Sequence, residues 1–156
     1  MKKQQKGFSL IELLIVVAII LIIAAIAIPN LLRSKMAANE ASAVGSIRTL
    51  NTACVSYSTT YGTYPTTLAN LGPASSATSG TADLVDSVLA SGTKSGYSFV
   101  YATGSTDNSG NVLSYSITAT PVTEGTTGQR GFYSDQSGVI RADASGSATA
   151  SSTPIS

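Results

Sequence analysis

The chain has 156 residues, which allow one domain with a modest hydrophobic core and one long appendage. Hydrophobic residues make up 43% of the chain and charged residues 11%, and the formal net charge of +1 indicates no basic surface for nucleic acid. The sequence has no histidine, which excludes Ser-His-Asp and Cys-His catalysis, and its single cysteine, Cys54, excludes an intrachain disulfide and a thiolate metal cluster.

The first element predicted along the chain is a helix of membrane length. From Phe8 to Ile28 the sequence reads FSLIELLIVVAIILIIAAIAI, 21 residues in which Glu12 is the only ionisable side chain. As a helix this segment spans about 30 Å, the thickness of the hydrocarbon core of a bilayer. Because the rest of the chain is too small to bury such a helix, we predict that the segment lies in lipid.

The charges at its two ends predict its orientation. Lys2, Lys3 and Lys6 precede the segment, and Arg33 and Lys35 follow it. This small excess favours a cytoplasmic N-terminus, with the remaining domain on the outer side. The rival interpretation is a secretory signal peptide that is discarded. Against it, the apolar run exceeds the usual length of about 7 to 15 residues, and a carboxylate near its start would serve no purpose there.

That carboxylate, Glu12, is the main candidate for a functional residue. A charged side chain within a membrane helix costs about 3 kcal/mol on insertion scales, so it usually marks a functional partnership. The alternative is that Glu12 reaches back to the nearby cytoplasmic interface, which would explain its tolerance but not its purpose.

Residues 30–61 are predicted to continue as an amphipathic helix. One stripe is apolar at helical spacing and should dock on a sheet: Val44, Ile47, Leu50, Cys54, Tyr57 and Tyr61. The other sides are dominated by polar residues: Arg33, Lys35, Asn39, Glu40, Ser42, Ser46 and Arg48. The position of Cys54 in the apolar stripe predicts a small buried hydrophobic side chain rather than a reactive thiol.

The region that follows the helix is predicted to begin with a packed loop. Gly62 and Pro65 end the helix, and Tyr64, Leu68 and Leu71 are expected to hold the loop against it.

A short helix is then predicted from four apolar residues, Leu84, Val85, Val88 and Leu89, and Gly92 caps it. Asp83 and Asp86 stand three residues apart and form a conceivable carboxylate pair, but such spacing on a surface helix is more often solvation. With no histidine and no phosphate-binding loop in the sequence, we predict no enzymatic activity and no cofactor.

Three strand regions are predicted from alternating apolar and polar residues, at 96–104, 111–122 and 130–143. The third contains the turn sequence DQSG and should be a hairpin of two short strands. The predicted fold is therefore α+β, a long N-terminal helix packed on a small antiparallel sheet. Residues 144–156 have low complexity and are expected to be mobile.

The stretch KGFSLIELLIVVAIILIIAAIAIPN closely resembles the class III signal of type IV pilins and of the related pseudopilins of type II secretion. The resemblance consists of a short basic leader, Gly7 before Phe8, Glu12 at the fifth position after that junction, the apolar run, and Pro29 near its end. It covers the first 35 residues and extends more loosely through the helix to residue 72.

The resemblance implies specific roles for these residues. A prepilin peptidase would cut between Gly7 and Phe8, and the new amine of Phe8 would be N-methylated. Glu12 would pair with that amine, on an adjacent subunit or on its own helix, as the filament grows. Pro29 lacks an amide hydrogen, and we predict a bend or a locally melted stretch between residues 22 and 29 in the assembled filament.

The resemblance also implies a helical homopolymer as the assembled form. The segments would be a leader at 1–7, a transmembrane and filament-core helix at 8–29, an amphipathic helix at 30–61, a globular head at 62–143, and a low-complexity tail at 144–156. The expected partners are further copies of the chain, the bacterial inner membrane before assembly, the prepilin peptidase and the pilus assembly machinery. The expected final location is an extracellular pilus filament.

Three functions stay open at this point. The preferred one is a major type IV pilin, whose fibre serves tasks such as adhesion, twitching motility or DNA uptake. The second is a type II secretion pseudopilin, which forms a short periplasmic filament. The third is a monomeric binding module anchored in the membrane, for which Glu12 would be incidental.

Two features of the head bear on that choice. Major pseudopilins commonly bind calcium in loops of the sheet, and Asp107, Asp135 and Asp143 lie in such loops here. Their spacing matches no calcium motif, so we predict that they form turns and that no metal is bound. Many pilins close a C-terminal loop with a disulfide, which Cys54 alone cannot do.

Overall fold

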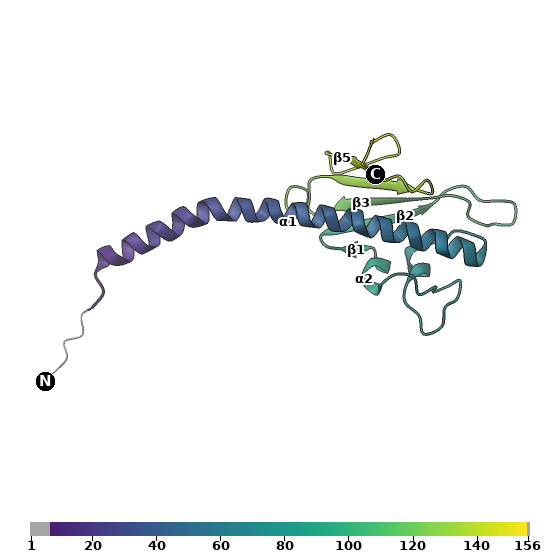
Figure 1. Cartoon of the computed structure of the whole chain (residues 1–156), viewed down its shortest axis with the longest axis horizontal. Coiled ribbons are helices and arrows are strands. Elements are labelled where there is room, and N and C mark those ends of the chain that lie inside the picture. Colours follow the sequence, from purple (N-terminus) through teal and green to yellow (C-terminus); the bar gives the residue numbers. More distant parts are fainter. Residues whose placement is uncertain (1–6, 156) are drawn as a thin grey trace. The chain divides into compact units, whose positions relative to one another are not determined.

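A computed structural model describes residues 7–155 and divides the chain into two compact units, the first ending at Lys35 and the second beginning at Met36. One helix, α1 (Leu10–Tyr61, 52 residues), supplies most of the first unit and continues into the second (Figure 1). The second unit adds two short helices and a six-stranded sheet. The α+β fold predicted from the sequence is confirmed.

In the first unit, the N-terminal part of α1 is apolar on every side. Its large side chains between Leu10 and Ile28 are exposed, with exposed fractions from 45% at Val17 to 76% at Leu10. By length and composition α1 qualifies as a candidate membrane span. Pro29 lies inside α1, which is assigned as one continuous helix. The bend predicted near Pro29 concerns the filament and stays a prediction.

In the second unit, α1 buries the stripe predicted from its spacing. Ile47, Leu50 and Cys54 have no exposed surface, Tyr57 is 4% exposed, and the two ends of the stripe are partly buried. The assignment of Glu40 and Ser46 to the polar sides is wrong, because both are buried. Glu40 is tolerated there because residues distant in sequence supply it with hydrogen bonds, as described below.

The loop after α1 packs as predicted. Gly62 follows the last helical residue with a φ of 74°, a left-handed conformation that ends a helix and that glycine adopts without strain. A 3-10 helix, η1 (Leu68–Leu71), then places Leu68 and Leu71 in the core, and Tyr64 packs against it.

The short helix predicted around Leu84–Leu89 is present as α2 (Ser87–Ala90). Leu89 is buried, whereas Val88 is half exposed. Asp86 is the N-cap, because its carboxylate accepts a hydrogen bond from the Leu89 N–H at 2.8 Å. Gly92, with a φ of 81°, follows α2 as predicted.

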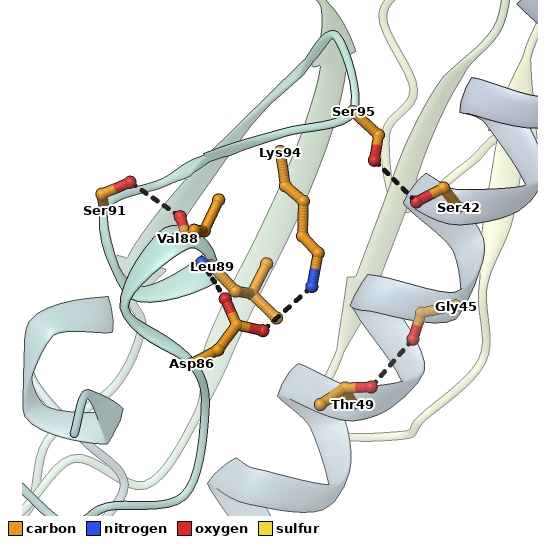
Figure 2. Close-up of polar contacts among 9 residues, drawn as sticks. All are labelled: Ser42, Gly45, Thr49, Asp86, Val88, Leu89, Ser91, Lys94 and Ser95. Atoms are coloured by element: carbon orange, nitrogen blue, oxygen red, sulfur yellow. Dashed lines mark hydrogen bonds and ion pairs between the residues drawn. The ribbon is translucent and has the colours of Figure 1, made fainter.

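A short strand missed by the sequence analysis follows α2. Strand β1 (Thr93–Lys94) turns tightly through Ser95 and Gly96 into β2 (Tyr97–Thr103). Both turn residues have positive φ, as a type I′ hairpin requires. Figure 2 shows this turn beside α1, where the Ser42 and Ser95 hydroxyls are 2.9 Å apart.

The remaining strands complete an antiparallel sheet in the order β1-β2-β3-β4-β5-β6. They are β3 (Tyr115–Pro121), β4 (Gly131–Asp135), β5 (Arg141–Asp143) and β6 (Thr153–Pro154). Strands β2 and β3 confirm the first two predicted regions, and β4 with β5 confirms the predicted hairpin.

The C-terminal segment is more ordered than expected. Strand β6 pairs with β5, Ala148 is 3% exposed, and the Ile155 N–H donates to the Ile140 carbonyl at 2.8 Å. The expectation of a mobile tail is therefore wrong for these residues. Low sequence complexity does not prevent a segment from pairing with a sheet edge, because that pairing uses the backbone.

The core of the second unit, which is called the head from here on, lies between α1 and one face of the sheet. Side chains from β2, β3 and β4 meet the apolar stripe of α1: Tyr97, Phe99, Tyr115, Ile117, Ala119 and Phe132. Burial of these side chains explains why alternation along each strand identified the sheet.

Candidate functional site

The candidate site lies at the start of α1, where a polar cap precedes the apolar segment. Ser9 is the last residue before the helix, and its carbonyl accepts a hydrogen bond from the Leu13 N–H at 3.3 Å. The Ser9 N–H donates to the Glu12 carboxylate at 2.8 Å. Glu12 therefore folds back over its own helix end, where a negative charge is favourable.

This local capping role was missed by the sequence analysis. A serine followed three residues later by a glutamate is half of a capping-box signature, and Ser9 and Glu12 have that spacing. The Ser9–Glu12 bond also places the carboxylate one residue from Phe8.

The predicted junction between Gly7 and Phe8 is open. The Phe8 side chain is 89% exposed, and a Cβ added to Gly7 would meet nothing within 4 Å. Glycine also leaves the backbone free to extend into a cleft. The structure thus brings Gly7, Phe8 and Glu12 together at one helix end, whereas Pro29 lies 17 residues beyond Glu12 on the same helix.

The three loop aspartates that were considered as calcium ligands form turns. The Asp107 carboxylate accepts hydrogen bonds from the Ser109 and Asn111 N–H groups, both at 2.8 Å. Asp135 and Asp143 each accept from the N–H two residues later, at 2.9 Å. The prediction that they form turns is confirmed. No group of three or more candidate metal ligands occurs within residues 7–155.

The other carboxylate pair from the sequence analysis also has a structural role. Asp86 caps α2 and forms an ion pair with Lys94 at 2.9 Å, both shown in Figure 2. Its pKa is held below the usual range, first by the Lys94 hydrogen bond and then by the Leu89 N–H. The Asp83 carboxylate accepts a hydrogen bond from the Ala74 N–H at 3.4 Å.

Cys54 behaves as the sequence predicted. It is completely buried, and burial raises the pKa of its thiol to about 12. Because the thiolate is the reactive form, we expect the Cys54 thiol to react slowly in the folded head.

An ion pair that the sequence analysis missed joins buried Glu40 of α1 to the half-exposed Arg130 of the β3–β4 loop. The Glu40 carboxylate accepts from the N–H groups of Gln129 and Arg130, at 3.0 and 3.1 Å, and from the Arg130 guanidinium at 2.8 Å. Beside it, the Asn39 amide donates to the Thr127 carbonyl at 2.8 Å. These contacts span about 90 residues of sequence and position the loop; they carry no chemistry of their own.

Comparison with known proteins finds a family match at the N-terminus. A family model described as the prokaryotic N-terminal methylation motif matches residues 2–28. Type II secretion system core protein G of Dickeya chrysanthemi is 35% identical over 72 residues, which cover 46% of this chain and 47% of that protein.

Pilins match over shorter stretches at higher identity. Type IV major fimbrial protein FimA of Dichelobacter nodosus is 52% identical over 58 residues, 35% of this chain and 37% of that protein. Type IV wide pilus major component PilA4 of Thermus thermophilus is 60% identical over 38 residues, 24% of this chain and 29% of that protein.

The matched region spans less than half of the length of each of these relatives. No solved structure matches the chain significantly. The chain thus carries the prokaryotic N-terminal methylation motif, has an α+β head behind one long helix, and is similar over part of its length to type IV pilins and to core protein G of type II secretion.

Proposed function

We propose that the chain is the major structural subunit of a type IV pilus, polymerised through side-by-side packing of α1. The observation that carries this proposal is the combination of an apolar helix surface, exposed on every side, with one carboxylate at its N-terminal end. A helix that is apolar all round must be buried, first by lipid and then by neighbouring copies. Assembly then exchanges one apolar environment for another.

Processing would begin at the open junction. A prepilin peptidase would cut between Gly7 and Phe8, and Phe8 would carry the methylated amine. The methylation motif at residues 2–28 and the exposure of Phe8 support this step.

The new amine would change the role of Glu12. In the uncut chain its carboxylate accepts the Ser9 N–H. After cleavage a positive charge would stand at Phe8, within reach of Glu12 of the same helix or of a neighbour. Either charge alone is penalised in lipid, whereas opposite charges in a low dielectric attract, so their pairing would favour side-by-side assembly and set its register.

The proposed route follows from these steps. The chain would first span the bacterial inner membrane once with its N-terminus in the cytoplasm, and then enter an extracellular filament through the pilus assembly machinery. The role is structural rather than enzymatic, as it is in the pilins and pseudopilins that the chain resembles.

The decisive experiment combines fibre recovery with mass spectrometry. Sheared fibres should contain this chain beginning at a methylated Phe8, and Glu12→Ala should abolish fibres while processing persists. Glu12→Asp is the matched control, since it keeps the charge and should retain part of the yield. Normal function of an unassembled, membrane-anchored Glu12→Ala protein would instead support a monomeric binding module.

A pseudopilin of type II secretion is the second candidate. It is favoured by the length of the match to core protein G, 72 residues against 58 for FimA. Deletion of the gene separates the two functions. Loss of surface fibres with normal protein secretion supports the pilin, and loss of secretion with fibres unchanged supports the pseudopilin.

A further inference from the structure

Within residues 7–155, the exposed cations that belong to no ion pair lie on α1. Arg33, Lys35 and Arg48 are exposed, and none belongs to either ion pair found within residues 7–155. The carboxylate of Glu40, on the same helix, is buried and paired with Arg130. In the second unit, the outer side of α1 therefore presents a cation without a neutralising carboxylate on its own helix.

In the described part of the second unit, the exposed negative charges lie on the loops of the head. Asp83, Asp107 and Glu124 are exposed, and in the part of the chain that the structure describes no cation lies within ion-pair distance of them. Asp86 is exposed as well, but Lys94 neutralises it. Within the second unit, Arg48 on α1 and these loop carboxylates thus lie on different elements.

One of these cations, Arg48, lines a hollow beside α1. Its volume is about 380 Å³, and it is lined by Arg48, Thr49, Thr52, Ala53, Ser56 and Leu84. The Thr49 hydroxyl donates to the Gly45 carbonyl, as Figure 2 shows, and the Thr52 hydroxyl donates to the Arg48 carbonyl. With these donors satisfied by the helix itself, Arg48 is the one charged group in the lining.

The loop between β2 and β3 has the complementary properties. Figure 1 shows that it projects beyond the ends of the two strands. Asp107 is held at its tip by the Ser109 and Asn111 N–H groups and by the Asn111 side-chain amide, each at 2.8 Å. A carboxylate fixed in this way loses little conformational entropy when it binds.

We propose that copies of this chain meet in a heterologous contact, in which the Asp107 loop of one copy enters the Arg48 hollow of the next. The contact rests on the proposed filament function and deepens it by naming one subunit interface. A two-fold contact could pair Arg48 of each copy with Asp107 of the other, but it would close at a dimer. The proposed filament function therefore requires the heterologous arrangement, which joins the same opposite charges and leaves one of each free at the two ends. A heterologous contact that does not close into a ring produces a filament.

A charge exchange in the full-length chain tests the contact. In cells that carry the assembly machinery, Arg48→Glu and Asp107→Arg should each lower the yield of sheared fibres about tenfold. The double variant R48E/D107R should restore most of the yield. The matched control is R48E/E124R, which alters another exposed loop carboxylate and should restore nothing. Equal recovery in the control, or none in R48E/D107R, would overturn the pairing.

Crosslinking keeps the test valid if the Asp107→Arg loop does not fold. In a Cys54→Ala background, the double variant R48C/D107C treated with a mild oxidant should give a ladder of dimers, trimers and larger species. R48C alone should give none. Dimers without a ladder, or no crosslink, would contradict the heterologous contact.

The two proposals fail in different ways. If wild-type cells make no fibres, the filament function fails, and a ladder among membrane-embedded copies still supports the contact. If wild-type fibres form while both the charge exchange and the crosslink are negative, the contact fails and the filament function stands.

Discussion

At the scale of single residues, Cys54 and Glu40 both occupy buried positions of α1, and their pKa values are shifted in opposite directions. Cys54 has no exposed surface and a thiol pKa raised to about 12 by burial. Burial also opposes ionisation of Glu40, but the N–H groups of Gln129 and Arg130 and the Arg130 guanidinium outweigh it and hold the carboxyl pKa below its usual range. Burial keeps the Cys54 thiol protonated, whereas the ionised Glu40 carboxylate links distant parts of the head.

We expect the Cys54 thiol to resist alkylation. At pH 8 iodoacetamide should leave it unmodified in the folded protein and modify it fully in urea, because the thiolate is both rare and inaccessible. Mass spectrometry measures the modification. The matched control is Arg48→Cys, which adds a thiol at an exposed position and should gain one adduct without urea. Rapid modification of Cys54 in the native protein would show that the core opens easily.

Replacement of Glu40 should make the head less stable and less sensitive to acid. Glu40→Ala should cost about 2 kcal/mol at pH 7, because it leaves the Arg130 guanidinium and two N–H groups without their acceptor. In the wild type this contribution is complete above the unfolded carboxyl pKa of about 4.3 and is lost as the pH falls through the lower folded value.

Thermal unfolding measures both effects. All seven tyrosines lie between residues 57 and 133, so near-ultraviolet circular dichroism reports on the head alone. Glu40→Gln is the conservative control, since it keeps the shape but cannot titrate, and it should lose less stability than the wild type between pH 6 and pH 3. An equal loss in both proteins would mean that other carboxylates dominate acid unfolding.

At the scale of elements, the contact between β4 and the loop after β5 depends on the close approach of two backbones rather than on large side chains. A Cβ on Gly131, at the start of β4, would collide with the backbone of Gly146 and Ser147. The loop after β5 therefore crosses β4 where only glycine fits. Gly45 contrasts with it, because its added Cβ would enter open space on α1.

These two glycines form a matched pair of substitutions. Gly131→Ala should destabilise the head by about 1–3 kcal/mol, because backbone must move to admit the methyl group. Gly45→Ala should stabilise it by about 0.5–1 kcal/mol through helix propensity. Tyrosine-detected melting measures both. A neutral Gly131→Ala would indicate that the loop after β5 adapts at little cost.

At the scale of the whole molecule, the two units differ in what covers their apolar surface. The second unit encloses its own core, to which α1 contributes six buried residues: Ala43, Ile47, Leu50, Ala53, Cys54 and Tyr57. The first unit leaves its apolar side chains exposed. We infer that the head needs nothing from the first unit in order to fold.

A fragment that begins at Pro29 should therefore be soluble and folded. It lacks the segment that is apolar all round and retains every residue of the core. Its tyrosine-detected melting temperature should match that of the full chain in detergent, and gel filtration should show a monomer. A fragment that melts far below the full chain would show that the first unit supports the head.

Properties with a local physical signal were determined by the sequence itself. A continuous apolar run identifies the membrane-length segment, period-3.6 spacing identifies the buried stripe of α1, and alternation identifies β2, β3 and the β4–β5 hairpin. Gly7, Phe8 and Glu12 lie close together in sequence, so their proximity at one helix end could be predicted without tertiary information.

Only the tertiary structure decided the features that depend on distant partners. Glu40 was assigned to a polar surface, and its burial follows from a loop about 90 residues away. Strands β1 and β6 have two residues each, which is too short for an alternating pattern to be recognised in the sequence. They form because a neighbouring strand supplies their hydrogen bonds. Periodicity is a property of a segment, whereas pairing is a property of two segments, and a single sequence records the first far more directly than the second.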